Sequence, residues 1–112
     1  MACIFCQIIS GDLSSEILYQ DERVIAIRDI NPQAPTHLLI MPKVHIASIA
    51  DVTDEEGALM ARLVYVANLL AKKEGIAETG YRLITNCGPH AGQAVPHLHF
   101  HLLGGRALGG LG

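Results

Sequence analysis

The sequence predicts a single domain, residues 1–112, that combines short strands with one long helix. Strand-like segments are separated by turn residues, and a capped stretch in the middle of the chain has apolar residues at helical spacing. At 112 residues the chain is long enough to bury a core without disulfide bonds. Half of the residues are apolar, Trp is absent, and Phe and Tyr total five, so this core should be aliphatic.

Composition also limits the partners. The formal net charge of -3 provides no basic surface, which argues against a nucleic-acid polymer. A small phosphorylated ligand remains compatible, since backbone amides and imidazoles bind phosphate without Lys or Arg. No stretch reaches membrane-spanning length and no secretory leader is recognisable, so we expect a cytoplasmic protein without a membrane contact. The three cysteines, an odd number, argue against a disulfide framework.

The N-terminal segment carries two cysteines in a short helical pattern. Cys3 and Cys6 have the spacing of half a zinc site, because two thiolates on one turn can face the same tetrahedral ion. The alternative is a thioredoxin-type redox pair, which is expected at a strand-to-helix junction and is less favoured here. Helical spacing predicts a helix over residues 4–9, ended by Ser10-Gly11. Its apolar residues, which contact either the core or a ligand base, are Ile4, Phe5, Ile8 and Ile9.

A hairpin and a loop come next. Residues 17–20 and 24–28 are predicted as strands on either side of a turn at Asp21-Glu22. Two prolines keep residues 29–35 irregular, and Asp29 at the start of this loop is interpreted first as a turn cap.

A third strand is predicted over residues 36–41 and is closed by Pro42. His37 lies near its start and His45 lies just beyond its end. In a chain with four other histidines and a cysteine pair, a metal-ligand or supporting role for these imidazoles competes with a structural one.

The long helix has a clear start and stop. Thr53 and Glu56 form a capping box, and the helix should extend to Lys73 or Glu74, with Gly75 as its stop. The core stripe is Leu59, Leu63, Val66 and Leu70, and the apolar arc is widened to roughly 160° by Met60, Val64, Ala67 and Ala71. Either a partner, most economically a second copy of the chain, or deep burial of the helix explains this width.

Residues 96–103 alternate histidine with apolar residues, which predicts a half-buried strand. His97, His99 and His101 would share one face, and three adjacent imidazoles indicate a metal or an anion. Another strand is predicted over residues 81–85. In the loop between them, Gly88 and Gly92 would let the backbone approach an anion. Cys87 and His90 are interpreted as loop residues, and His90 is a minor candidate for a metal.

The segment His97-Leu98-His99-Phe100-His101-Leu102-Leu103 resembles the His-φ-His-φ-His-φ-φ signature of the histidine-triad (HIT) family. Residues 29–37, 42–45, 92–95 and 103–106 extend the likeness over almost the whole chain, which is most similar to the Hint-like nucleoside phosphoramidases. This resemblance implies an α+β fold with a five-stranded antiparallel sheet and two helices. It also implies a homodimer that joins the two sheets into one through the long helix.

The resemblance implies roles for individual residues, including a catalytic triad of His97, His99 and His101. His99 resembles the nucleophile that attacks the α-phosphorus of a purine nucleoside phosphoramidate, giving a nucleotidyl-histidine that water converts to the nucleoside monophosphate. His101 would bind phosphate and donate a proton to the leaving amine. Asp29 would hold the ribose hydroxyls, which replaces its interpretation as a turn cap. The other implied nucleotide contacts are Ile4, Phe5, Ile8 and Ile30 at the purine, and Asn86, Gly92, Gln93 and Ala94 at the phosphate.

The cysteine pair is similar to that of zinc-bearing bacterial members of the family. The resemblance implies a closed, structural zinc site, with His37 supporting it from outside the set of ligands. The implied ligands are Cys3, Cys6, His45 and His97.

Two departures from the Hint-like pattern affect the expected activity. Ala94 stands where Ser commonly follows Gln, which predicts slower turnover, and residues 107–112 lack the Trp-Pro-Pro ending that shapes the choice of leaving group. Two alternatives remain, a dinucleoside-polyphosphate hydrolase and a nucleotide- or zinc-binding module with little catalysis. The Hint-like segment 103–106 argues against the first, and the complete histidine triad argues against the second.

Overall fold

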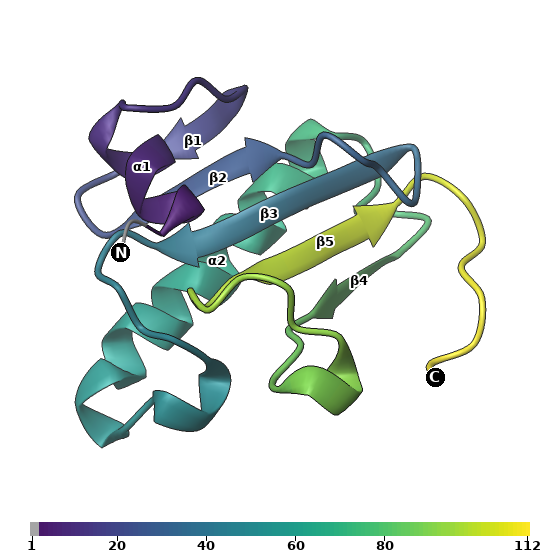
Figure 1. Ribbon diagram of the computed structural model, residues 1–112. Coiled ribbons are helices and arrows are strands. Elements are labelled where there is room, and N and C mark those ends of the chain that lie inside the picture. Colours follow the sequence, from purple (N-terminus) through teal and green to yellow (C-terminus); the bar gives the residue numbers. More distant parts are fainter. Residues whose placement is uncertain (1–2) are drawn as a thin grey trace.

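A computed structural model describes residues 3–112, which form one antiparallel sheet with a helix on each face (Figure 1). The sheet order is β1-β2-β3-β5-β4. The strands are β1 (Ile17–Gln20), β2 (Val24–Arg28), β3 (Thr36–Pro42), β4 (Tyr81–Ile84) and β5 (Phe100–Gly104). The helices are α1 (Ile4–Ser10) and α2 (Gly57–Lys73), with 3-10 turns at Ile49–Asp51, Asp54–Glu56 and Pro89–Ala91. The predicted α+β fold of five antiparallel strands and two helices is confirmed.

Alternation along the central strands divides the core into two layers. Val24 and Ala26 on β2 face α2 together with Leu38 and Ile40 on β3. The residues between them, including Ile25 and Leu39, face α1. Both layers are aliphatic apart from a few aromatic rings, as the composition predicts.

Helix α2 begins after the predicted capping box. The Glu56 carboxylate accepts from the Thr53 amide at 2.7 Å, and the residues between them form a 3-10 turn, so the α-helix starts at Gly57. Gly75 takes a φ of 75° and ends it. Burial explains most of the wide apolar arc, because Ala67 and Ala71 are fully buried and only Val64 among the widening residues is exposed.

The last strand is shorter than predicted. It begins at Phe100 rather than near Pro96, so His97 and His99 precede the strand. The pairing of Ile40 with Phe100 would place Leu98 opposite Pro42, which has no N–H to donate. The Leu98 amide instead donates to the Ile46 carbonyl at 2.6 Å. The predicted strand over residues 81–85 also ends one residue early, at Ile84.

No helix within residues 3–112 is both long enough and apolar enough to cross a membrane.

Candidate active site and metal centre

A row of imidazoles crosses the face of the sheet that α1 covers. His45 and His97 lie at one end with ring centroids 5.0 Å apart, and His99, His101 and His37 continue the row with successive centroids 5.1 Å apart. The Phe5 ring of α1 lies over the middle, 5.9 Å from His97 and 5.0 Å from His99. The sequence predicted that the three triad histidines share a face, and the contacts of these rings agree with it.

At one end of the row, four side chains converge with the spacing of a tetrahedral metal site. The Nδ1 atom of His97 lies 3.5 Å from the Cys3 Sγ and 3.6 Å from the Cys6 Sγ, and the His45 Nδ1 lies 3.4 Å from the Cys6 Sγ. Zinc bonds of about 2.3 Å to sulfur and about 2.0 Å to nitrogen place these atoms about 3.5 Å apart at the tetrahedral angle. All four potential ligand atoms lie within 4.8 Å of one another. The residues present therefore fit zinc.

Hydrogen bonds orient these potential ligands in a way that is compatible with metal binding. The His97 Nε2–H donates to the Pro42 carbonyl at 2.8 Å, which leaves the Nδ1 lone pair directed at the thiols. The Cys6 amide donates to the Cys3 Sγ at 3.4 Å. Burial and then the neighbouring Cys3 raise the pKa of the Cys6 thiol. A bound cation would favour the thiolate and oppose this shift.

His99 has one ring nitrogen engaged and one available. Its Nδ1 lies 2.7 Å from the His97 carbonyl oxygen, so Nδ1 carries the proton and donates it to that oxygen. The lone pair is then on Nε2. His99 is only 7% exposed, so this lone pair lies in a largely desolvated site.

At the other end of the row, His37 sets the orientation of His101. The Gln33 amide donates to the His37 Nδ1 at 3.0 Å, so the His37 proton is on Nε2. This Nε2–H lies 2.9 Å from the His101 Nδ1 and 3.3 Å from the Asp29 carboxylate. His101 accepts at Nδ1 and must hold its own proton on Nε2. These short distances are typical of hydrogen bonds. The four potential ligand atoms at the other end of the row have the wider spacing that is typical of metal ligands.

The interpretation of His37 as a support for the metal site is wrong. Because β3 and β5 are antiparallel, His37 pairs with Leu103, at the opposite end of β5 from His97. It therefore contacts His101 and not the metal ligands.

Burial lowers the basicity of this part of the row. The pKa of His101 falls to about 4, first because burial disfavours the charged ring and then because His99 and His37 lie close to it, although Asp29 opposes the shift. Burial also lowers the pKa of His37, again against the effect of Asp29. Both rings are therefore neutral at pH 7.

Asp29 caps a turn and also lines a pocket. One carboxylate oxygen accepts from the Asn31 amide at 2.8 Å and caps the turn after β2. The other faces His37, and the residue also lines a pocket. Its contact with ribose remains a prediction.

A pocket of about 190 Å³ lies between α1 and the end of β2. It collects the predicted purine-binding residues Ile4, Phe5, Ile8 and Ile30 together with Asp29, although Ile30 is 88% exposed. Six further lining residues were not predicted: Leu13, Ser14, Ser15, Ile27, Arg28 and Leu39. The alternation of β2 and β3 could have indicated Ile27 and Leu39, but residues 13–15 carry no signal in the sequence.

The Gln93 side chain stabilises the loop between β4 and β5, which is predicted to contact the phosphate. Its side-chain amide donates to the Ala47 and Val95 carbonyls at 2.8 and 3.0 Å, and its oxygen accepts from the Gly88 amide at 3.0 Å. Asn86 is half-buried in this loop, whereas Gly92 and Ala94 are exposed. Phosphate contacts of these residues remain predictions. His90 is exposed and belongs to neither group of potential metal ligands found among residues 3–112.

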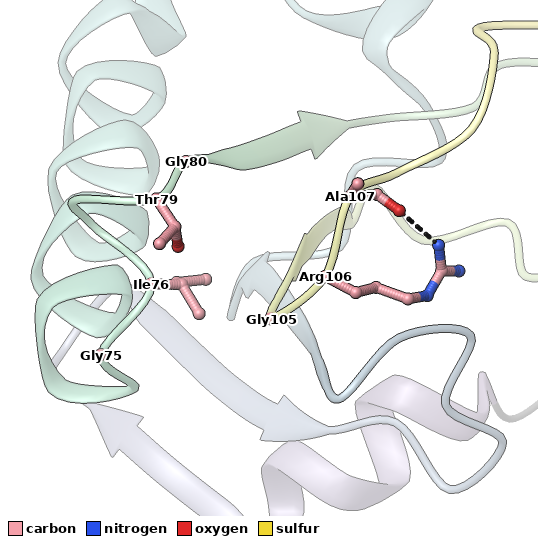
Figure 2. A pocket seen from close by; sticks show the side chains of 7 residues that line it. All are labelled: Gly75, Ile76, Thr79, Gly80, Gly105, Arg106 and Ala107. Carbon is pink, nitrogen blue, oxygen red and sulfur yellow. Dashed lines mark hydrogen bonds between the residues drawn. The ribbon is translucent and has the colours of Figure 1, made fainter.

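A larger cavity, about 480 Å³, lies between the turn that follows α2 and the segment that follows β5 (Figure 2). Among residues 3–112, Arg106 is the only charged side chain in its lining, and its guanidinium donates to the Gln33 and Ala107 carbonyls. The described residues of the lining include no imidazole, thiol or carboxylate, so the candidate chemistry lies at the imidazole row and not in this cavity. The lining residues are Gly75, Ile76, Thr79, Gly80, Gly105, Arg106 and Ala107.

The fold and the imidazole row define a histidine-triad protein, and the HIT domain model matches residues 10–108. The chain belongs to the HIT family, as the resemblance predicted. It is 53% identical over 106 residues to a purine nucleoside phosphoramidase of Escherichia coli, a match that covers 95% of this chain and 89% of that protein.

Two further matches also cover most of the chain. A 14 kDa zinc-binding protein of Zea mays is 48% identical over 107 residues, with 94% of this chain and 83% of that protein covered. The structure of a HIT family hydrolase from Clostridium thermocellum superposes with a TM-score of 0.94 at 54% identity, covering 97% of this chain and 95% of that one.

Proposed function

We propose that this protein hydrolyses purine nucleoside 5'-phosphoramidates and releases the nucleoside monophosphate. The observation that carries the proposal is the proton position on His99, whose Nδ1–H is held by a main-chain carbonyl while Nε2 keeps its lone pair. A nucleophile and a pocket for the base lie side by side, because Phe5 both touches His99 and lines the pocket. The name of the Escherichia coli relative supports this substrate class.

The proposed reaction has two displacements at phosphorus. The His99 Nε2 attacks, the P–Nε2 bond forms, and the P–N bond to the amine breaks as the amine takes up a proton. Water then attacks the nucleotidyl-histidine, the P–Nε2 bond breaks, and His99 returns to its neutral form. The net reaction consumes one water and yields a nucleoside monophosphate and an amine.

His101 is the proposed proton donor to the amine. With its pKa at about 4 in the free protein, it is neutral at pH 7 and offers its Nε2–H as a hydrogen bond. A phosphate anion placed beside it would favour the charged ring and raise this pKa. Substrate binding would therefore let His101 take up a proton from solvent, and His101 would pass this proton to the leaving amine.

The remaining contacts follow from the pocket. Its apolar lining suits a purine, and Asp29 at its edge suits the ribose hydroxyls. The phosphate oxygens would lie against the loop that contains Asn86 and residues 92–94, where backbone amides can stabilise the charge that develops.

We also propose that Cys3, Cys6, His45 and His97 hold zinc in a closed structural site. The metal would supply a cross-link between the N-terminal segment and the triad, with no open position for substrate. Its support is the tetrahedral spacing of the four ligand atoms and the printed name of the maize relative.

A homodimer in the cytoplasm completes the proposal. Strand β4 is at one edge of the sheet, and on α2 the Val64 and Tyr65 side chains are 46% and 55% exposed. An open edge beside exposed apolar side chains is suited to a second copy of the chain.

The activity is tested with adenosine 5'-phosphoramidate, followed by release of AMP from zinc-loaded protein. The wild type should turn over, and His99→Ala should lower the rate by at least about a thousandfold. His90→Ala is the matched control, because this exposed histidine lies outside the imidazole row, and it should keep the wild-type rate.

Other outcomes would replace the proposal. Faster cleavage of a diadenosine polyphosphate than of the phosphoramidate would identify a dinucleoside-polyphosphate hydrolase. AMP binding without cleavage of either substrate would identify a binding module.

A further inference from the structure

Helix α1 connects the metal centre to the nucleotide pocket. Cys3 caps the helix and Cys6 lies in its first turn, so both thiols are at its N-terminal end. Phe5 and Ile8, only 6% and 8% exposed, line the nucleotide pocket from the same helix. A single element of seven residues therefore contributes to both sites.

Few polar contacts with distant parts of the chain, other than those of the thiols, fix the position of α1 within the described residues. Within residues 3–112, the polar contacts from Cys3 and α1 to distant parts of the chain are those of Cys3 and Cys6 with His45 and His97. The other hydrogen bonds of this segment are local and end by Leu13. Apolar packing against β2 and β3 is non-directional, and a helix this short has little stability of its own.

His97 connects the same metal centre to the nucleophile. Its ring nitrogen is one of the four clustered ligand atoms, and its main-chain oxygen accepts the His99 Nδ1–H at 2.7 Å. The Phe5 ring packs edge-on against both imidazoles. A metal that fixes the His97 ring and the two thiols would therefore also fix the groups around the His99 Nε2.

We propose that the metal centre positions α1 over the nucleotide pocket, so that zinc and a purine nucleotide bind cooperatively, with Phe5 as the positioning residue that couples the two sites. This rests on the proposed function, because it takes the pocket to be that of the nucleotide. Coupling between two binding sites is reciprocal, so zinc raises the affinity for nucleotide by the same factor by which nucleotide raises the affinity for zinc.

The test measures both sides of this linkage with AMP and zinc as the probes. Calorimetry of AMP binding compares zinc-loaded protein with protein stripped by a chelator, and the stripped form should bind AMP roughly tenfold more weakly. In the opposite direction, saturating AMP should raise the zinc affinity, measured against a chromophoric chelator, by the same factor. Equal AMP affinity with and without zinc, or no zinc bound by the purified protein, overturns the proposal.

Three variants separate coupling from general damage. Cys6→Ser should lower both zinc and AMP affinity, whereas Cys87→Ser, which changes an exposed thiol outside both sites, should alter neither. Phe5→Leu should still bind one zinc per chain, while the ratio of AMP affinities with and without zinc falls toward one. A Phe5→Leu protein that keeps the full ratio refutes the assignment of Phe5.

The measurement remains decisive if the stripped protein unfolds. Zinc release is then followed from the loaded, folded protein with and without AMP, and unchanged release overturns the proposal. The outcomes also distinguish the two proposals. Loaded protein that does not bind AMP refutes the proposed function, whereas loaded and stripped proteins that bind it equally refute only the coupling.

Discussion

Replacing Gln93 with alanine tests whether this side chain shapes the loop or binds phosphate directly. The substitution removes three hydrogen bonds, to the carbonyls of Ala47 and Val95 and from the amide of Gly88. At about 1 kcal/mol each the loss would approach about 3 kcal/mol, and water entering this half-buried loop reduces it to about 1–3 kcal/mol. An unfolding entropy of about 2.1 cal/mol/K per residue converts this to a drop in Tm of about 4–13 °C.

The assay is thermal unfolding of zinc-loaded protein by circular dichroism, in parallel with kcat/KM. The matched control is Gln20→Ala, which removes one exposed hydrogen bond from the Lys43 ammonium and should change the free energy of unfolding by less than about 0.5 kcal/mol. The refuting result is a Gln93→Ala protein with a lower kcat/KM but the same Tm as Gln20→Ala. Gln93 would then act on the phosphate, and the reasoning from its three hydrogen bonds would be wrong.

Four further predictions concern other parts of the chain. Gly105→Ala should lower the free energy of unfolding by about 2–4 kcal/mol in a denaturant titration, because φ is +95° and the new Cβ would lie 2.8 Å from a proline carbon; Gly110→Ala, with open space around it, should not. The free energy of unfolding should fall as the pH drops from 6.5 toward 4, because His101 binds a proton more readily in the unfolded chain than in the folded one. At constant zinc loading, His101→Gln should flatten this pH dependence, and equal slopes for the variant and the wild type contradict the prediction. Ala94→Ser should raise kcat, and an unchanged kcat removes the role assigned to the missing hydroxyl. Val64→Glu should shift the mass measured by light scattering from dimer to monomer, and a monomeric wild type excludes the proposed α2 interface.

The sequence predicted the shared face of the triad because a strict period of two determines which side chains lie together. It misplaced the start of the last strand because pairing depends on the partner, and Pro42 cannot donate to Leu98. It misassigned His37 for a similar reason. Nothing in the spacing of residues 37 and 97 shows that antiparallel pairing places His37 beside Leu103, at the end of β5 that is farther from His97.

The pocket between α1 and the end of β2 shows another limit of prediction from sequence. The resemblance identified five of its lining residues, and they meet in one cavity. Residues 13–15 have no periodic or motif pattern, and they reach the pocket only because the turn after α1 leads the chain past it. Their position depends on tertiary packing and not on a local signal.

The main-chain partners of the imidazoles give His99 a distinct spectroscopic identity. Among His37, His97, His99 and His101, His99 alone holds its proton on Nδ1, while the other three hold theirs on Nε2. Ring-nitrogen chemical shifts distinguish these tautomers, so nuclear magnetic resonance of the resting protein should single out the ring of the proposed nucleophile without substrate or mutation. The same asymmetry makes His99 the member of this group that an acylating reagent specific for a free Nε2 should modify first.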